Sequence, residues 1–262
     1  MFAAVTFFGG ITLAVLSGCG GDGLVDDQNP DTASASDTGW VCDTSYSVHV
    51  DEPSGLAWDA KRRALWTVSD HTGKISLIDL TGNTLKTLPW FGHDVEGIAY
   101  DESLGLLFVV DEVAGSITTL DTNGTVLNER FLTGVGEGGN AGLEGIACLP
   151  DSGKLLVLRE DNPPTLFVVS PGGNISTLAY MRYAGDISGA DYDPTTGRLW
   201  IISDQSKRVY WLRLDGSLVG AWKTGVGGGE GIVGVGDTLY IISDDHEVLY
   251  RFLYHPGGAA EL

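Results

Sequence analysis

Acidic residues recur at two fixed positions of a repeated pattern, and carboxylates gathered in this way could bind a cation. Glu96, Glu144 and Glu230 each stand directly before a glycine that opens an apolar segment. Further acids stand at the ends of apolar runs, namely Asp70, Glu112, Glu160, Asp204 and Asp244. Oxygen ligands without clustered His or Cys favour Ca²⁺, whereas Mg²⁺ rarely occupies an all-protein cage. These carboxylates are therefore the candidate metal ligands, and Ca²⁺ is the expected cofactor.

The pattern that carries these acids is a repeat of about forty residues. The segment DVEGIAYD at residues 94–101 has four variants elsewhere in the chain, and the glycines they share are Gly55, Gly97, Gly145, Gly189 and Gly231. Successive glycines are 42, 48, 44 and 42 residues apart. A period in the low forties with β-branched and aromatic runs is typical of β-propeller blades. Short Gly/Asn turns between the runs, such as Thr81-Gly82-Asn83, favour four strands in each repeat.

The ends of the repeat array predict how the ring closes. The fifth repeat supplies only three strands before the chain reaches His255-Pro256. The alternating segment Ser45–Val50 precedes the first glycine and could pair with the last strand, which would remove the open edge. We therefore predict an all-β, five-bladed propeller over residues 45–255, closed by an N-terminal strand added to the last blade and followed by a tail at 256–262.

Propeller geometry predicts that the two acid groups meet. The innermost strand of a blade starts on the same face on which the second strand ends, so both groups should converge on one funnel mouth, with Glu52, Asp94 and Asp186 adding to its rim. Their repulsion could be relieved by protonation, by hydrogen bonds that tie loops, or by a cation. Ser54 and Ser188 replace the glutamate in two repeats, which favours an off-centre ion. The alternative is a metal-free mouth.

Composition excludes some functions. The formal net charge of −20 argues against nucleic acid and against anionic membrane surfaces, and it favours cations. Arg159 is the only base beside the acids, and it could pair with one of them or hold an anionic substrate. His71 and His246 read as surface loop residues. The chain shows no Ser/His/Asp arrangement, and its Gly-rich segment 134–139 lacks the Lys and Ser/Thr of a phosphate loop.

The N-terminal sequence is typical of an exported lipoprotein. An apolar run is followed by Leu16-Ser17-Gly18-Cys19, which resembles a bacterial lipobox and predicts a signal peptide at 1–18 and lipidation of Cys19. Residues 19–44 then read as an acidic flexible tether. Gly20 after the cysteine predicts an outer-membrane location, facing the periplasm or the cell surface. An ordinary cleaved signal with an incidental cysteine is the alternative.

Two cysteines remain, Cys42 and Cys148. Export permits a disulfide between them. Both should lie toward one face of the disc, but the end of the tether would have to cross that face, so a bond and two unpaired thiols both stay open.

The Ser/Glu-Gly-Ile/Leu-Ala segments, the strands ending in Ser-Asp or Asp-Glu, and turns such as Asp-Leu-Thr-Gly-Asn resemble the SdiA-regulated, YjiK/CarP-like propellers of bacteria over residues 50–254. The resemblance implies an exported or membrane-anchored protein, a link to calcium in some members and a phytase-like description for others. It also implies that Glu96, Glu144 and Glu230 are acidic mouth residues.

We therefore expect an envelope-anchored, monomeric, calcium-binding module with an acidic mouth and no nucleic-acid partner. A metal-dependent hydrolase, either phytase-like or a lactonase, and a metal-free interaction scaffold are the alternatives. The shortage of Lys and Arg counts against a multiply phosphorylated substrate unless calcium bridges the phosphates.

Overall fold

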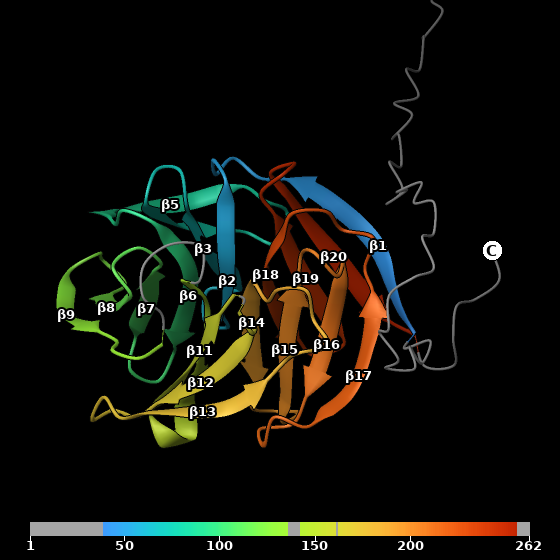
Figure 1. The fold of residues 1–262 in the computed structure, drawn as a ribbon. Coiled ribbons are helices and arrows are strands. Elements are labelled where there is room, and N and C mark those ends of the chain that lie inside the picture. The colour runs from blue at the N-terminus through green and yellow to red at the C-terminus, as the bar shows by residue number, and fades with distance from the viewer. Residues whose placement is uncertain (1–38, 136–141, 161, 256–262) are drawn as a thin grey trace, which may run out of the picture.

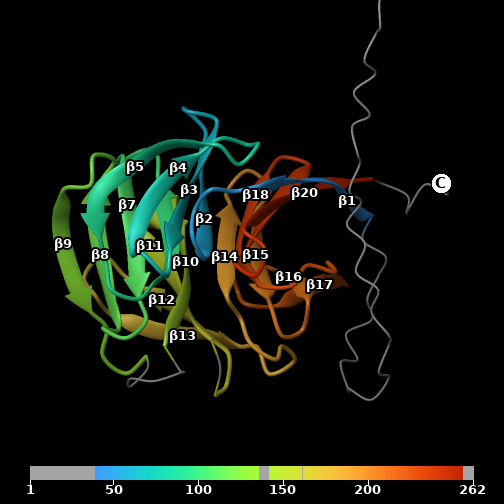
Figure 2. The ribbon, with the colours of Figure 1, turned by 90° about the horizontal axis from the view of Figure 1, so that it is seen from above.

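The protein is a five-bladed β-propeller (Figures 1 and 2). The computed structural model describes residues 39–135, 142–160 and 162–255. The expected signal peptide, Cys19, most of the expected tether and the C-terminal tail lie outside the described residues. Within the described part, no helix is long and apolar enough to cross a membrane.

Each blade is a four-stranded antiparallel sheet, and in the first four blades the strands follow one another in chain order from the axis to the rim. Blade 1 comprises β2 (Pro53–Asp59), β3 (Ala64–Ser69), β4 (Lys74–Ile78) and β5 (Thr84–Phe91). Blade 2 comprises β6 (Val95–Asp101), β7 (Leu106–Asp111), β8 (Ser116–Asp121) and β9 (Val126–Phe131). Blade 3 comprises β10 (Leu143–Leu149), the 3₁₀ turn η1 (Pro150–Ser152), β11 (Lys154–Arg159), β12 (Thr165–Val169) and β13 (Ile175–Tyr180). Blade 4 comprises β14 (Gly189–Asp193), β15 (Arg198–Ser203), β16 (Arg208–Leu212) and β17 (Leu218–Lys223).

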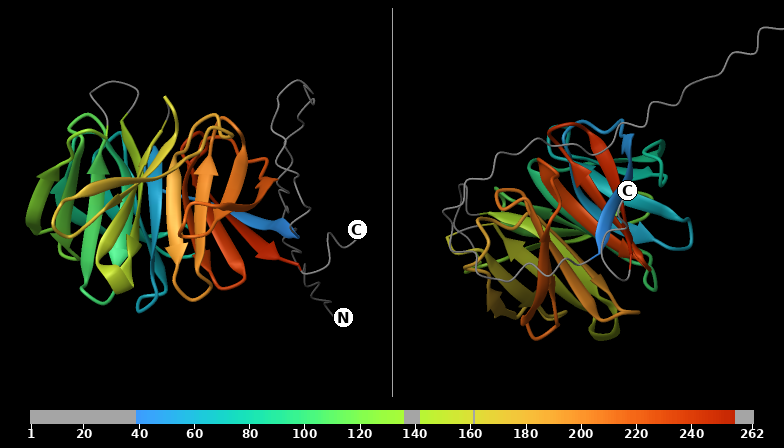
Figure 3. Two further views of the ribbon diagram at one scale, coloured as in Figure 1. Left: turned by 60° about the horizontal axis from the view of Figure 1, so that its bottom comes forward. Right: turned by 90° about the vertical axis from the view of Figure 1, so that its right-hand side faces the viewer.

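Blade 5 closes the ring with the N-terminal strand, as predicted. Its strands are β18 (Gly229–Val235), β19 (Thr238–Ser243), β20 (Val248–Tyr254) and β1 (Trp40–Ser47). The blue β1 lies along the red β20 in Figures 1 and 3, with Trp40 opposite Tyr254 and Ser47 opposite Val248. The first and last described strands therefore belong to one sheet, and their pairing closes the ring.

The closing strand begins earlier than the sequence predicts, at Trp40 rather than at Ser45. The Trp40 ring stacks on Trp222, with ring centroids 5.8 Å apart, and meets Trp200 edge-on at 5.7 Å. Aromatic pairs of this kind add to the free energy gained from buried area. The expected tether therefore ends before Trp40, whose side chain docks on the propeller.

The outer turns of the blades follow the predicted glycine chemistry. Gly82, Gly124, Gly173 and Gly216 have φ angles between +81° and +89°, a region that suits glycine. In the first of these turns Asp79 Oδ1 accepts hydrogen bonds from the backbone N–H groups of Thr81 and Asn83. These bonds hold the pKa of Asp79 below its ordinary value, although burial opposes them.

The core lies between blades rather than in one central cluster. Five groups of buried apolar side chains each join one blade to the next, for example Trp66 of blade 1 with Leu107 and Val109 of blade 2. Strands β3, β15 and β19 are therefore buried on both faces of their sheets, which explains their nearly continuous apolar runs.

The disulfide between Cys42 and Cys148 is absent, because Cys148 is a free cysteine. Cys42, on the outermost strand of blade 5, packs against the apolar cluster between blades 4 and 5. Cys148, on the innermost strand of blade 3, packs against the cluster between blades 2 and 3. Burial raises the pKa of the Cys148 thiol, so this side chain behaves as a small apolar group.

The repeated glycines form a ring at the axis of the propeller. We use the name glycine ring for Gly55, Gly97, Gly145, Gly189 and Gly231. A Cβ at Gly97 would lie 2.5 Å from the carbonyl oxygen of Glu144, and a Cβ at Gly189 would lie 2.3 Å from that of Glu230. Each glycine thus meets the backbone of the next blade, and Gly231 meets Gly55 to complete the circle. Only glycine permits the innermost strands to approach so closely.

We predict that Gly97→Ala lowers the free energy of unfolding by about 2–3 kcal/mol, because the new methyl group would overlap backbone atoms that cannot move aside alone. The φ angle at Gly97 lies outside the left-handed region, so the effect would come from packing rather than backbone strain. Gly220→Ala is the matched control in outer strand β17, where the nearest atom to a Cβ is 3.9 Å away. Urea unfolding curves measure both variants, and equal midpoints would contradict the prediction.

Candidate functional site

The acidic residues gather at one end of the central channel, on the side where the innermost strands begin. A cavity of about 310 Å³ opens there, which we call the acidic mouth, and its acidic lining residues are Glu52, Asp70, Glu96, Glu144, Glu160, Asp186, Asp204, Glu230 and Asp244. Ser54, Ser188 and Gln205 complete its described lining, which contains no Lys, Arg or His. Seven of the eight candidate ligands expected from the sequence therefore line one cavity.

The glycine ring explains why the glutamates converge. Glu96, Glu144 and Glu230 directly precede ring glycines, so their side chains start at the narrowest part of the channel. All three are largely withdrawn from solvent. Ser54 and Ser188 hold the same position in blades 1 and 4, and Ser54 Oγ donates a 2.5 Å hydrogen bond to the backbone carbonyl of Glu96.

Glu112 is the candidate that does not line the mouth. Its side chain lies against Gly142, where a Cβ would be 1.8 Å from Glu112 Cγ, and it borders a separate cavity of about 70 Å³. Burial and the neighbouring Asp94 raise the pKa of Glu112 to about 7. It remains electrostatically linked to the mouth through Glu160, which also raises its pKa.

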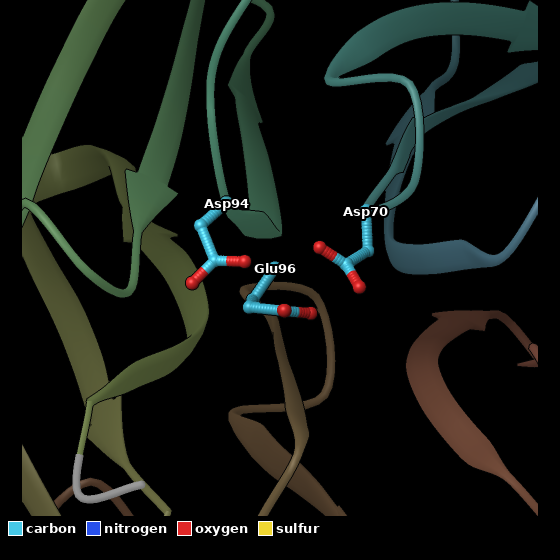
Figure 4. Close-up of side chains that lie close together, drawn as sticks. All are labelled: Asp70, Asp94 and Glu96. Atoms are coloured by element: carbon cyan, nitrogen blue, oxygen red, sulfur yellow. The ribbon is translucent and has the colours of Figure 1, made fainter. Parts of the chain in front are cut away.

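Three carboxylates come together more closely than the others. Asp70, Asp94 and Glu96 each offer an oxygen atom, and these atoms all lie within 4.8 Å of one another. Figure 4 shows the three side chains pointing into a common space, with Asp70 from the β3–β4 turn and Asp94 from the segment before β6. Two of the three were candidate ligands from the sequence. The sequence predicted Asp94 only at the rim of the mouth, because its position two residues before Glu96 does not indicate where its side chain points.

The acids on the opposite side of the mouth are tied to loops. Asp186 accepts hydrogen bonds from Ser203 Oγ at 2.5 Å and from the backbone N–H of Gln205. Asp204 pairs with Lys207, with Oδ1 and Nζ 2.6 Å apart. These hydrogen bonds and this ion pair tie loops of blade 4, whereas the crowded carboxylates lie at blades 1 and 2.

Burial and mutual repulsion raise the pKa values of the mouth acids. The pKa of Glu144 is raised by burial and then by Glu96 and Glu160, and that of Glu96 is raised by burial and then by Asp70 and Glu230. The pKa of Glu230 is raised to about 8 by burial and by Asp244 and Asp204. Asp79, whose carboxylate accepts hydrogen bonds within a turn, instead has a pKa below its ordinary value. Burial and repulsion thus favour the protonated forms of Glu96, Glu144 and Glu230 in the metal-free mouth.

The remaining expected residues take other roles. Arg159 donates to the carbonyl oxygens of Val135 and Pro163 and to Thr165 Oγ1, so it supports the loops beside blade 3. His71 is exposed, with its ring nitrogens 3.7 Å from Asp51 and 3.9 Å from Glu52. His246 is also exposed, as expected for a surface loop.

We predict that Glu230→Gln stabilises the metal-free protein at alkaline pH. The folded protein retains the Glu230 proton up to about pH 8, whereas the ordinary value is 4.5. The native state therefore binds more protons between these values, and the free energy of unfolding falls as the pH rises through this window. In a chelating buffer the variant should match the wild type near pH 4.5 and exceed it by roughly 4 kcal/mol at pH 8, because each pH unit between these values costs the folded wild type about 1.4 kcal/mol.

Chemical unfolding across this pH range measures the effect. Glu129→Gln is the control, because Glu129 is an exposed acid on the outer strand β9. Parallel pH profiles for the wild type and Glu230→Gln would show that Glu230 carries its charge in the folded protein.

Comparisons with known proteins agree with this architecture. In the solved structure titled "Crystal structure of Nidogen/Laminin Complex", the matched chain has a TM-score of 0.56 and 20% sequence identity, covering 73% of this chain and 72% of that one. The structure titled "Streptogramin B lyase structure" matches with a TM-score of 0.48 and 16% identity, over 84% of this chain and 76% of that one. The first of these similarities supports the propeller fold and nothing finer. The family model described as SdiA-regulated matches residues 36–252, and this chain belongs to the SdiA-regulated family.

Proposed function

We propose that this protein is an envelope-anchored, monomeric propeller that binds Ca²⁺ in its acidic mouth and acts as a binding or calcium-response module. The observation that carries the proposal is the convergence of Asp70, Asp94 and Glu96, whose oxygens lie within 4.8 Å of one another. Ca²⁺ holds its oxygen ligands at 2.3–2.6 Å, so two ligands on opposite sides of the ion lie roughly 5 Å apart. The spacing therefore fits a shared ion.

The chemistry of the donors also fits calcium. The described lining offers carboxylate, hydroxyl and amide oxygens and no imidazole or thiolate, which disfavours Zn²⁺ and copper. Glu144 lies close enough to Glu96 for its pKa to rise through their repulsion, so it is the next residue able to share the ion. A bound divalent cation would relieve the repulsion that now raises these pKa values. Flexible ligation by several carboxylates suits Ca²⁺ better than Mg²⁺.

Binding is a better-supported role than hydrolysis. A phosphoester or lactone hydrolase would use the ion to polarise its substrate or to activate water. No Lys, Arg or His belongs to the described lining of the mouth, so a multiply charged phosphate would depend on calcium alone. Hydrolysis of phosphoester or lactone substrates that is lost in Glu96→Gln would favour the enzyme, whereas activity unchanged in that variant would exclude the mouth as its site.

We predict that Ca²⁺ raises the melting temperature of the protein. At a concentration of about 100 times its Kd, a ligand that binds only the native state adds about 2.7 kcal/mol to the free energy of unfolding. For a domain of this size the melting temperature should rise by roughly 5–10 °C, and by much less with Mg²⁺. The measurement is a thermal melt of the full chain carrying Cys19→Ser, in EDTA and across a calcium series.

Three variants locate the ion within that experiment. Glu96→Gln and Asp94→Asn should lose most of the calcium-induced rise, because each removes a charged ligand from the close group. Glu129→Gln, in the same blade but exposed on β9, should retain the rise. A flat response of the wild type to calcium would leave a metal-free acidic scaffold as the function.

The envelope location rests on the sequence before the propeller. Cys19 is followed by an acidic segment, and the first strand of the propeller is β1, so a lipid on Cys19 would leave the propeller on a tether. The charge of −20 does not favour adhesion to an anionic membrane surface, which makes a covalent anchor the simpler means of attachment. The Gly20 that follows favours the outer membrane.

We predict that the protein expressed in a bacterial host incorporates labelled palmitate and fractionates with membranes. Cys19→Ser should abolish both, because the lipobox places the lipid on Cys19. Cys148→Ala is the matched control, since it removes the free cysteine of β10 instead. Membrane fractionation that persists in Cys19→Ser would point to a different means of attachment.

A further inference from the structure

The channel has a second cavity at its other end, beyond the glycine ring. Its volume is about 330 Å³, and it is lined by the ends of the innermost strands of all five blades. Side chains that define it include Trp58, Tyr100, Tyr192, Cys148 and Asp191. We call this space the aromatic cavity. It is separate from the acidic mouth, because the ring glycines touch each other's backbones between the two.

Around the aromatic cavity, four of the five blade interfaces pair a larger side chain with a smaller one, and the fifth interface does not. Three positions after the ring glycine stand Trp58, Tyr100, Cys148 and Tyr192 in blades 1 to 4. Each packs in the same apolar cluster as a small or β-branched residue of the preceding blade, which is Val233, Ala57, Ala99 and Ala147 in turn. The larger side chain of each pair, which is aromatic in three cases and Cys148 in the fourth, thus packs near a smaller one of the neighbouring blade.

Between blades 4 and 5 the arrangement is reversed. The large residue is replaced by Gly234, and the small one by Asp191, whose Oδ2 accepts a 2.9 Å hydrogen bond from the Gly234 backbone N–H. An acid at a position that is otherwise alanine or valine costs free energy, because one hydrogen bond does not replace the water around a carboxylate. Asp191 still borders the cavity, so part of its carboxyl group can reach a molecule held there.

The charge of the lining selects the kind of molecule. Glu102, Asp191 and Asp193 are the ionisable acids of the described lining, which contains no Lys, Arg or His. Aromatic faces attract cations through the ring quadrupole, most strongly quaternary ammonium groups. A cavity of about 330 Å³ whose lining combines aromatic rings with a few acids has the size of a small-molecule site.

From this geometry we propose that the aromatic cavity is a binding site for a small organic ammonium ion, whose charge pairs with Asp191 and whose apolar part contacts Trp58, Tyr100 and Tyr192. Burial raises the pKa of Asp191 to about 7, and a neighbouring cation would stabilise its charged form. The aromatic cavity and the acidic mouth have different lining residues, so this proposal does not depend on calcium binding.

The test is isothermal titration of the full chain carrying Cys19→Ser, at pH 8 and in EDTA, with two probes of equal shape. Choline carries a quaternary ammonium group, and 3,3-dimethylbutan-1-ol is its uncharged isostere. We expect saturable binding of choline and at least about tenfold weaker binding of the alcohol, because the alcohol lacks the charge that the rings and Asp191 attract.

Asp191→Asn should weaken choline binding by a similar factor while keeping an oxygen acceptor for the Gly234 N–H. Asp237→Asn is the matched control, because Asp237 is exposed in the neighbouring β18–β19 turn and does not line the cavity. Absence of saturable choline binding, equal affinity for the two probes, or equal losses in Asp191→Asn and Asp237→Asn would overturn the proposal. If Asp191→Asn fails to fold, the affinities of choline and of 3,3-dimethylbutan-1-ol for the chain that retains Asp191 test the proposal.

Discussion

The close approach of five innermost strands at the axis governs the rest of this structure. Gly97 and its equivalents meet the backbone of the next blade at distances that leave no space for a Cβ. Because the circle closes through Gly231 and Gly55, a substitution at one ring position would disturb two blades at once. The apolar clusters between blades depend on this spacing, since each is built from the facing sheets of two neighbours.

The same approach creates the electrostatic character of the mouth. A residue directly before a ring glycine has its backbone at the narrowest point, so Glu96, Glu144 and Glu230 are brought together whether or not their charges favour it. Loop hydrogen bonds and Lys207 offset the negative charge at blade 4. At blades 1 and 2 burial first, and then the neighbouring carboxylates, raise the pKa values of Asp70 and Glu96. The charge is thus unevenly compensated around the ring.

One channel therefore has two ends of different chemistry. Above the glycine ring the described lining is almost entirely oxygen-bearing, and below it aromatic and aliphatic side chains alternate with a few acids. Both ends use departures from the repeat to become asymmetric. Serines replace glutamates in the mouth, and Gly234 opposite Asp191 replaces a large and small apolar pair in the aromatic cavity. A five-fold scaffold can in this way carry sites that are not five-fold.

The repeat alone determined the fold class, the number of blades, the closing strand and the end of the channel at which the acids meet, because glycine spacing and strand periodicity are local properties of the chain. Other features required the folded molecule. The start of β1 at Trp40 depends on rings contributed by Trp200 and Trp222, far away in sequence. Cys42 and Cys148 lie on different blades, and the sequence did not decide whether they form a disulfide.

The grouping of Asp70 and Glu96 with Asp94, rather than with Glu144 and Glu230, was likewise decided by the tertiary structure. Side-chain direction at a loop residue such as Asp94 is set by neighbouring blades and not by its position in the repeat. The cavity beside Asp191 shows the same dependence, since it requires the glycine of one blade to face the acid of another. Periodicity thus specifies where backbones run, whereas contacts between repeats specify which side chains share a site.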